Sequence, residues 1–122
     1  MLASVNRLKK KKDFEKIFKE GTGYKENFLY LKIKKSNQET TRFGFIVSKK
    51  FSAKSTVRNK IKRMLREIIR INLPHIRRGI DGVIVIMPGF KINNFWELEE
   101  IIRKLLKKSG VLKNITPKIK LR

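Results

Sequence analysis

A helical apolar stripe opposite a row of cations, within residues 47–70, sets the strongest limit on how this chain can fold. The apolar residues recur at the three- and four-residue spacing of one helix face, at Val57, Ile61, Met64, Leu65 and Ile68. At about 100° per residue, the opposite arc collects Asn59, Lys62, Arg63, Arg66 and Arg70. We therefore expect a helix that packs one flank on a core and presents cations on the other.

The charges on this helix are almost all of one sign. Glu67 is the only carboxylate between Lys49 and Arg70, whereas an ordinary solvated helix face mixes signs so that neighbours attract. Like charges on one face repel each other unless a polyanion neutralises them. A solvated face is the alternative, but a phosphate-binding surface explains the pattern better. Further cations beside the arc extend it: Lys49, Lys50, Arg58 and Lys60.

The whole chain is strongly cationic. Its 122 residues contain 32 Lys and Arg against 10 Asp and Glu, a formal net charge of +22, which favours a nucleic-acid partner. No apolar span or anchor accompanies the charge, so we expect no membrane partner. The lack of cysteine fits a reducing cytoplasm, and residues 1–12 have no apolar signal-peptide core. The length predicts a single domain over residues 1–122, with a loosely ordered basic arm at 1–11 and a basic tail at 111–122.

Aromatic side chains lie among cations in the first third of the chain. Residues 13–20 predict a short helix with Phe14, Ile17 and Phe18 on one face. Residues 27–35 predict a strand whose alternation places Phe28, Tyr30 and Lys32 on one face. These aromatics either pack inside the fold or form a stacking platform for single-stranded nucleic acid. The lysines on the same strand face favour a partly open surface.

The remaining elements predict a mixed fold. Residues 36–41 would close a hairpin between the strand at 27–35 and a second strand at 42–48, and residues 49–54 could add a short third strand. After the long helix, Pro74 begins a loop, and the apolar run at 82–87 predicts a strand buried on both faces. A strand, a helix and a strand in that order predict a βαβ unit with a parallel pair. Asn94 and Glu97 predict the capped start of a closing helix that packs on the sheet.

The sequence around the long helix resembles that of a known family. The signature of the bacterial ribonuclease P protein component is Ser-Lys-Lys and then Arg-Asn-Arg-x-Lys-Arg-x-x-Arg-Glu, to which residues 48–50 and 58–67 are similar. The resemblance extends to Arg7-Leu-Lys-Lys, Asp13-Phe14, Ile17-Phe18, Gly21 and Phe28-Leu-Tyr30, so it covers nearly the whole chain. Lys60 departs from the usual arginine and forfeits a planar bidentate phosphate contact.

The resemblance implies an α+β fold: a single compact α/β sandwich in the order α-β-β-β-α-β-α, with a left-handed βαβ crossover. It also implies an endoribonuclease holoenzyme whose RNA subunit, with bound magnesium, removes the 5′ leader from precursor tRNA. In that family the signature helix lies beside the catalytic RNA, and a cleft between the first helix and the sheet holds the leader. We expect one protein per RNA.

The site residues follow by position. Those expected to bind the catalytic RNA are Lys49, Lys50, Arg58, Asn59, Lys60, Lys62, Arg63, Arg66 and Arg70. Those expected to bind the precursor-tRNA leader are Phe14, Phe18, Phe28 and Tyr30, to which we add Lys32 from the same strand face.

We expect no catalytic side chain and no metal site in the protein itself. The carboxylates are scattered, and the group at Glu97, Glu99 and Glu100 is explained by the start of a helix. His75 is the only histidine, so a paired-histidine mechanism of RNA cleavage is excluded. The alternatives are a structural RNA-binding protein of ribosomal type, a helix-turn-helix DNA binder and a nuclease that acts without RNA.

Overall fold

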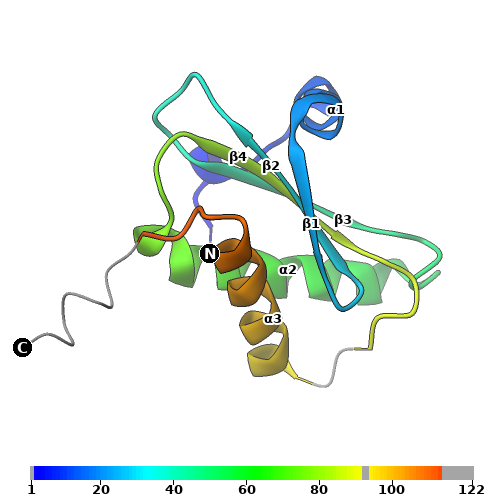
Figure 1. Ribbon diagram of the computed structural model, residues 1–122. Helices are drawn as coiled ribbons and strands as arrows, with labels where there is room; N and C mark the ends of the chain where they lie inside the picture. Colours follow the sequence, from blue (N-terminus) through cyan, green and yellow to red (C-terminus); the bar gives the residue numbers. More distant parts are fainter. Residues whose placement is uncertain (1, 92–93, 114–122) are drawn as a thin grey trace, which may run out of the picture.

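A computed structural model describes residues 2–91 and 94–113 (Figure 1). In this part of the chain three helices and four strands follow the expected order α-β-β-β-α-β-α. They are α1 (Lys11–Glu20), β1 (Thr22–Glu26), β2 (Leu29–Lys35), β3 (Arg42–Val47), α2 (Ser55–Asn72), β4 (Ile80–Ile86) and α3 (Phe95–Lys108). Two short 3-10 turns, η1 (Ser4–Asn6) and η2 (Leu73–His75), precede α1 and follow α2.

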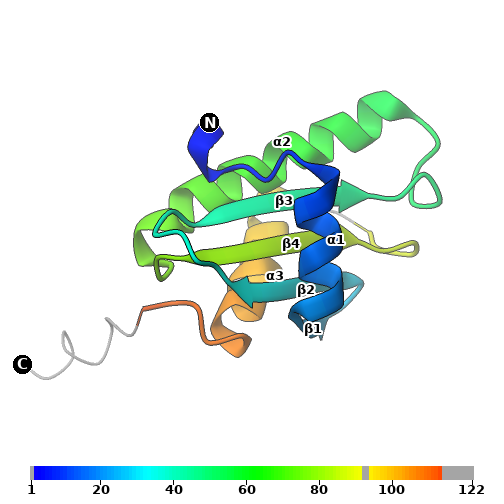
Figure 2. The same cartoon turned by 90° about the horizontal axis from the view of Figure 1, so that it is seen from above.

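The four strands form one sheet in the order β1-β2-β4-β3. β2 pairs antiparallel with β1 and with β4, whereas β3 pairs parallel with β4. The unit β3-α2-β4 is therefore the predicted βαβ unit. Figure 2 views the sheet from the side of α1, with β3 and β4 pointing the same way and α2 behind them. This arrangement makes the crossover left-handed, as the family resemblance implied and against the general right-handed rule.

Two strand predictions were wrong. Residues 36–41 do not close a hairpin, because β4 lies between β2 and β3 in the sheet. The hairpin joins β1 to β2 and turns at Asn27, whose φ of 60° lies in the left-handed region that asparagine tolerates. Residues 49–54 form a turn instead of a strand, in which the Ser48 carbonyl accepts a hydrogen bond from the Phe51 N–H at 3.0 Å. The additional strand is therefore β1, which precedes β2, and not the segment between β3 and α2.

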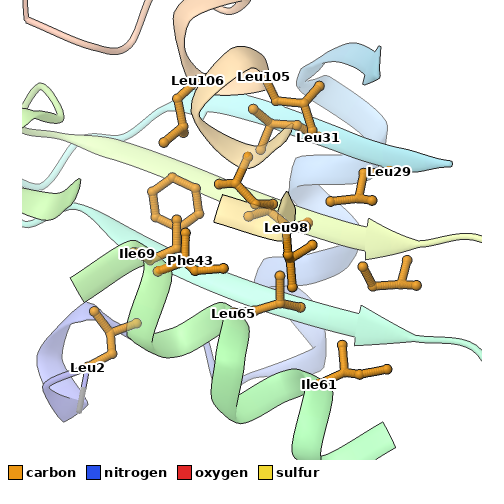
Figure 3. Close-up of a cluster of buried hydrophobic side chains, with 14 of the residues drawn as sticks. Leu2, Leu29, Leu31, Phe43, Ile61, Leu65, Ile69, Leu98, Leu105 and Leu106 are labelled. Carbon is orange, nitrogen blue, oxygen red and sulfur yellow. The ribbon is translucent and has the colours of Figure 1, made fainter. Parts of the chain in front are cut away.

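The main core lies between the sheet and the helices α2 and α3, which cover the face opposite α1 (Figures 1 and 2). Figure 3 shows side chains of α2, α3, β2 and β3 meeting in this layer, among them Ile61, Leu65, Leu98, Leu31 and Phe43. The apolar stripe predicted for the long helix therefore packs on the sheet. Val57 is an exception at 37% exposure, because the first turn of α2 lies beyond the end of β3 (Figure 2).

The first residues are part of the fold, which differs from the loose basic arm expected at 1–11. Leu2 and Leu8 are buried, and the Leu8 N–H donates to the Phe43 carbonyl at 3.0 Å on the outer edge of β3. At the other end Val111 is buried and the Lys113 N–H donates to the His75 carbonyl at 2.7 Å. The rest of the expected basic tail, residues 114–122, lies outside the described residues. Within the described ranges, every helix is too short or too polar to cross a membrane.

Candidate nucleic-acid interface

The outward face of α2 presents a continuous polar row. Thr56, Asn59, Arg63 and Arg66 line one shallow hollow, at the i, i+3, i+7 and i+10 spacing of a single helix face. The buried residues of α2, such as Ile61 and Leu65, lie on the opposite flank. The predicted division between an apolar flank and a cationic flank is therefore present, and we call the four residues the α2 row.

The cations of the α2 row keep their charge uncompensated. In the described part of the chain neither Arg63 nor Arg66 is within 4.0 Å of a carboxylate oxygen. Burial lowers the pKa of the Arg66 guanidinium, and the positive charges of Arg7 and Arg63 lower it further. A half-buried cation surrounded by other cations is costly unless an anion is bound there. The α2 row therefore has the electrostatics of an anion-binding surface.

Arg70 does not share this property, although it was predicted to belong to the open arc. Its guanidinium donates to both carboxylate oxygens of Glu67, with Nε to Oε1 at 3.0 Å and Nη2 to Oε2 at 2.5 Å. The hydrogen bond from Arg70 holds the pKa of Glu67 below its usual range, so this carboxylate is ionised at neutral pH. The charge of Arg70 is thus largely balanced within the same helix.

The other predicted cations surround the start of α2. Lys49 and Lys50 are exposed in the turn at 48–54, where the Ser48 hydroxyl accepts a hydrogen bond from the Lys50 N–H at 2.9 Å. Arg58 is half-buried and donates from Nη1 to the Ser52 carbonyl at 2.8 Å, which ties this turn to the helix. Lys60 is exposed. Lys49 and Lys50 thus add positive charge beyond the N-terminal end of the α2 row, and Arg58 and Lys60 add it along the same helix.

Helix α1 crosses the other face of the sheet (Figure 2). Phe14 and Ile17 pack α1 on that face. Phe14 lies directly over Gly44 of β3, where a Cβ would be only 2.4 Å from the ring. One flank of α1 faces charged residues, since Asp13 is 3.6 Å from Arg42 and Glu20 is 3.7 Å from Lys34. Phe18 lies one helical turn after Phe14, on the side of α1 away from Asp13 and Glu20, and is 37% exposed.

Beside that second flank the sheet surface is incompletely covered. Tyr30, Val85 and Ile46 are register partners across β2, β4 and β3, and all three are only half-buried. The Tyr30 ring lies over Gly23 of β1, and the Lys32 Nζ is 5.8 Å from the centre of that ring. We call these residues, together with Phe14 and Phe18, the open sheet face. It combines aromatic surface with cations, as single-stranded nucleic-acid sites do.

The structure thus brings four of the five predicted leader residues around one surface: Phe14, Phe18, Tyr30 and Lys32. Phe28 differs from the prediction because it precedes β2 and belongs to the turn after β1. Its carbonyl accepts a hydrogen bond from the Met87 N–H at 2.9 Å, and its ring lies about 3.4 Å from where Gly89 would carry a Cβ. With 44% exposure, it occupies the end of the sheet instead of the strand face.

Sequence reasoning missed two groups of residues. Arg7 and Lys9 share a pocket with Lys62 and Arg66, although they are more than fifty residues away in the chain. A signal was present in the basic stretch at 7–12, but its contact with β3 is a long-range property of the fold. Sequence reasoning also missed Asp81, whose carboxylate accepts two hydrogen bonds from Arg42 near the first turn of α1.

The described residues offer no cluster of metal ligands, since no three His, Cys, Asp or Glu side chains converge among them. Asn59, the amide of the α2 row, has Arg63 and Arg66 as neighbours in its hollow. Their charges oppose direct binding of a cation there. The side chains in the described residues therefore do not provide the ligands of a magnesium site.

Comparison with known proteins gives consistent similarities. The family model described as Ribonuclease P matches residues 2–110. A ribonuclease P protein component of Dictyoglomus turgidum is 37% identical over 109 residues, which cover 88% of this chain and 91% of that protein. One from Pseudanabaena is 37% identical over 113 residues, which cover 92% of this chain and 97% of that protein.

Solved structures agree with these matches. The RNase P protein of Thermotoga maritima superposes with a TM-score of 0.76 at 36% identity, over 84% of this chain and 96% of that one. The RNase P protein of Staphylococcus aureus gives a TM-score of 0.81 at 27% identity, over 88% of this chain and 98% of that one.

Proposed function

The chain belongs to the ribonuclease P protein component family, and from this premise we propose that it helps an RNA subunit to remove the 5′ leader from precursor tRNA. The observation that supports this most strongly is the presence of two different surfaces on one small fold. The α2 row is cationic and lies on a rigid helix, whereas the open sheet face is aromatic and cationic together. A folded RNA and a single strand require these two kinds of surface.

In this proposal the α2 row and the cations near its start bind the RNA subunit. Arg63 and Arg66 have no carboxylate partner in the described ranges, so phosphate groups would supply the missing negative charge. Guanidinium groups donate in a planar fork that matches phosphate oxygens. Arg70 contributes less, because Glu67 already occupies its donors.

The open sheet face binds the leader. Tyr30 offers an aromatic surface for a base, and Lys32 stands close enough to pair with the adjoining phosphate. Phe14 and Phe18 form the wall provided by α1. A leader held there would be positioned relative to the α2 row through β3, the strand that touches both α1 and α2.

The hydrolysis is assigned to the RNA subunit, with magnesium, held by that RNA, supplying the metal-ion chemistry. The protein's part is to bind and to screen phosphate charge. Asn59 can donate a hydrogen bond to a phosphate oxygen or accept one from an ion-bound water. We further propose one protein per RNA and a cytoplasmic location, where tRNA precursors are processed.

The test is reconstitution with the cognate RNA subunit. We expect the protein to accelerate leader removal at low magnesium, where the RNA alone is slow. A structural RNA-binding protein would bind without accelerating the reaction, and an independent nuclease would cleave without the RNA. Either of those outcomes would contradict the proposal.

A further inference from the structure

The turn between β3 and α2, at residues 48–54, carries two exposed cations, Lys49 and Lys50. In the described part of the chain neither ammonium group lies within 4.0 Å of a carboxylate oxygen. The turn projects beyond the end of β3 (Figure 2), so the sheet does not hold its tip. Cations on such a turn bind phosphate best when the backbone is already ordered, because ordering it on binding costs conformational entropy. We call residues 48–54 the lysine turn.

Ser48 holds the first half of the lysine turn. Its hydroxyl accepts a hydrogen bond from the Lys50 N–H at 2.9 Å, and its carbonyl accepts one from the Phe51 N–H at 3.0 Å. A hydroxyl that accepts from the N–H two residues later is a common way to stabilise a turn. The Phe51 side chain is half-buried and packs against the main core. Ser48 therefore fixes the backbone that carries both lysines, although it has no charge of its own.

Arg58 holds the second half of the lysine turn. Its Nη1 donates to the Ser52 carbonyl at 2.8 Å. Arg58 lies three and seven residues before Ile61 and Leu65, which are buried, so it shares their side of α2. It is also about 100° around the helix from Asn59 of the α2 row. The guanidinium is thus directed to the turn and away from the α2 row.

Arg58 also differs in exposure from the cations around it. It is half-buried, whereas the neighbouring lysines are exposed: Lys49, Lys50, Lys54 and Lys60. A phosphate that took the Nη1 donor would leave the Ser52 carbonyl without this hydrogen bond, and an unpaired carbonyl is costly where it is shielded from water. The geometry therefore favours a structural contact for Arg58 over a contact with RNA.

We propose that Ser48 and Arg58 are positioning residues, which fix the lysine turn so that Lys49 and Lys50 bind phosphate, and that Arg58 makes no phosphate contact of its own. The choice of RNA as the ligand rests on the proposed function. The proposal changes the expectation for Arg58, which the family resemblance places among the residues that bind the catalytic RNA. In this part of the signature a serine and an arginine hold the turn, and the two lysines between them contact the RNA.

The first test measures amide hydrogen exchange in the free protein. Arg58→Gln and Ser48→Ala should each accelerate exchange at the Phe51 N–H by about fivefold, as expected when one hydrogen bond that holds the turn is lost. Lys60→Gln is the matched control, because it removes the same charge from an exposed position on α2 that donates no hydrogen bond to the turn within the described ranges. Its exchange at Phe51 should equal that of the natural chain.

The second test is a double-mutant cycle in RNA binding. Lys49→Gln with Lys50→Gln gives a background in which the turn has no charge at its tip. We expect Arg58→Gln to weaken binding of the RNA subunit by about fivefold in the natural chain, but by less than about twofold in this background. Ser48→Ala should behave in the same way, and it checks the result if Arg58→Gln unfolds. Lys60→Gln should weaken binding by the same factor in both backgrounds.

The salt dependence of Ser48→Ala gives a result that loss of charge cannot explain. This variant removes no charge, yet we expect it to reduce the slope of log affinity against log salt concentration, because Lys49 and Lys50 no longer hold their phosphates. The reduction should be about 0.7–1.8, for the loss of one or both phosphate contacts. Ser48→Thr keeps a hydroxyl that can accept from the Lys50 N–H, so it should retain the natural slope.

Three results would overturn the proposal. Arg58→Gln could weaken binding by the same factor with and without the two lysines, which would show that Arg58 contacts phosphate itself. The other two are an unchanged exchange rate at Phe51 in both positioning variants and an unchanged salt slope for Ser48→Ala. The cycle is run with polyuridylate as well as with the RNA subunit, so it does not depend on leader removal. Coupling to the lysines in a protein that fails to accelerate leader removal would count against the proposed function alone.

Discussion

Arg42 on β3 donates two hydrogen bonds to Asp81 on β4, from Nε to Oδ1 at 3.0 Å and from Nη2 to Oδ2 at 2.8 Å. The Asp81 side chain is only 10% exposed, and the same guanidinium reaches Asp13 of α1 at 3.6 Å. Hydrogen bonding to Asp81 raises the pKa of Arg42. This pair joins two neighbouring strands beneath α1, the helix that forms one wall of the open sheet face. Through its contact with Asp13, Arg42 also connects these strands to that helix.

Loss of this pair is expected to destabilise the fold. Asp81→Ala leaves the largely buried Arg42 charge with only the longer contact to Asp13 at 3.6 Å, and we expect a loss of about 2–3 kcal/mol in the free energy of unfolding, somewhat below the value for a fully buried pair that loses its only partner. Denaturant unfolding measures this loss. The matched control is Glu39→Ala, whose partner Arg78 is 3.9 Å away and 82% exposed, and which should cost less than about 1 kcal/mol. Equal effects would show that the Arg42 pair has no special role.

Gly44 should tolerate no side chain while Phe14 is present. Gly44→Ala places a Cβ 2.4 Å from the Phe14 ring, so α1 must shift, at an expected cost of about 1–3 kcal/mol. Phe14→Leu should recover part of that stability in the double variant, because the smaller side chain makes room. Thermal or denaturant unfolding of the two single variants and the double variant provides the test. Strictly additive losses would contradict the contact.

Tyr30 should distinguish substrates with a leader from those without one. Tyr30→Ala removes the stacking surface beside Lys32, and we expect it to weaken holoenzyme binding of precursor tRNA by about 1–3 kcal/mol while leaving mature tRNA unchanged. Tyr30→Phe keeps the ring and is the control, with near-normal binding expected. Equal losses for both tRNAs would exclude a leader site on the open sheet face.

Glu67 should restrain RNA binding at neutral pH. Because Glu67→Gln removes the charge that balances Arg70, we expect this variant to bind the RNA subunit more tightly than the natural chain at pH 7. The pKa of Glu67 is depressed in the folded state, so its contribution to stability is present above the unfolded pKa and is lost as pH falls through the folded pKa. The difference in affinity for the RNA subunit between Glu67→Gln and the natural chain should therefore shrink toward acid pH, because a protonated Glu67 is uncharged, as glutamine is. A difference that is constant with pH would contradict the pairing.

Asn59 should affect the ionic requirement more than binding. Asn59→Ala is expected to raise the magnesium concentration needed for half-maximal leader removal while changing the affinity for the RNA subunit little, because the amide adds no net charge to the α2 row. Magnesium titrations of the reconstituted holoenzyme measure the first quantity and filter binding the second. An unchanged magnesium requirement would remove Asn59 from this role.

Local signals in the sequence predicted the helices well. The stripe at Ile61, Leu65 and Ile68 faces the core, and the Asn94 side chain caps α3 by accepting from the Glu97 N–H at 2.9 Å. Both patterns depend on residues within a few positions of one another, which helical spacing fixes. The apolar run of β4 was also predicted, because a strand buried on both faces needs no alternation.

Pairings between distant segments could not be predicted in the same way. The position of β4 between β2 and β3, the contact of Leu8 with β3 and the Arg42–Asp81 pair all join residues more than thirty positions apart. β1 has little apolar content and is mostly exposed, so its strand signal was weak. Charge alone also did not distinguish Arg70, which is paired with Glu67, from Arg66, which forms no ion pair within residues 2–91 and 94–113. For the candidate site, the sequence predicted the two surfaces but not the packing of the N-terminal segment on β3.

The central claim is that the α2 row is left open for the phosphates of folded RNA, and salt dependence tests it most directly. For the natural chain, log affinity for the RNA subunit should fall steeply and linearly with log salt concentration. Arg63→Gln with Arg66→Gln should reduce that slope by about 1.4–1.8, or about 0.7–0.9 for each phosphate that the protein no longer neutralises. A slope that is the same for the double variant, or a flat response for the natural chain, would contradict the account.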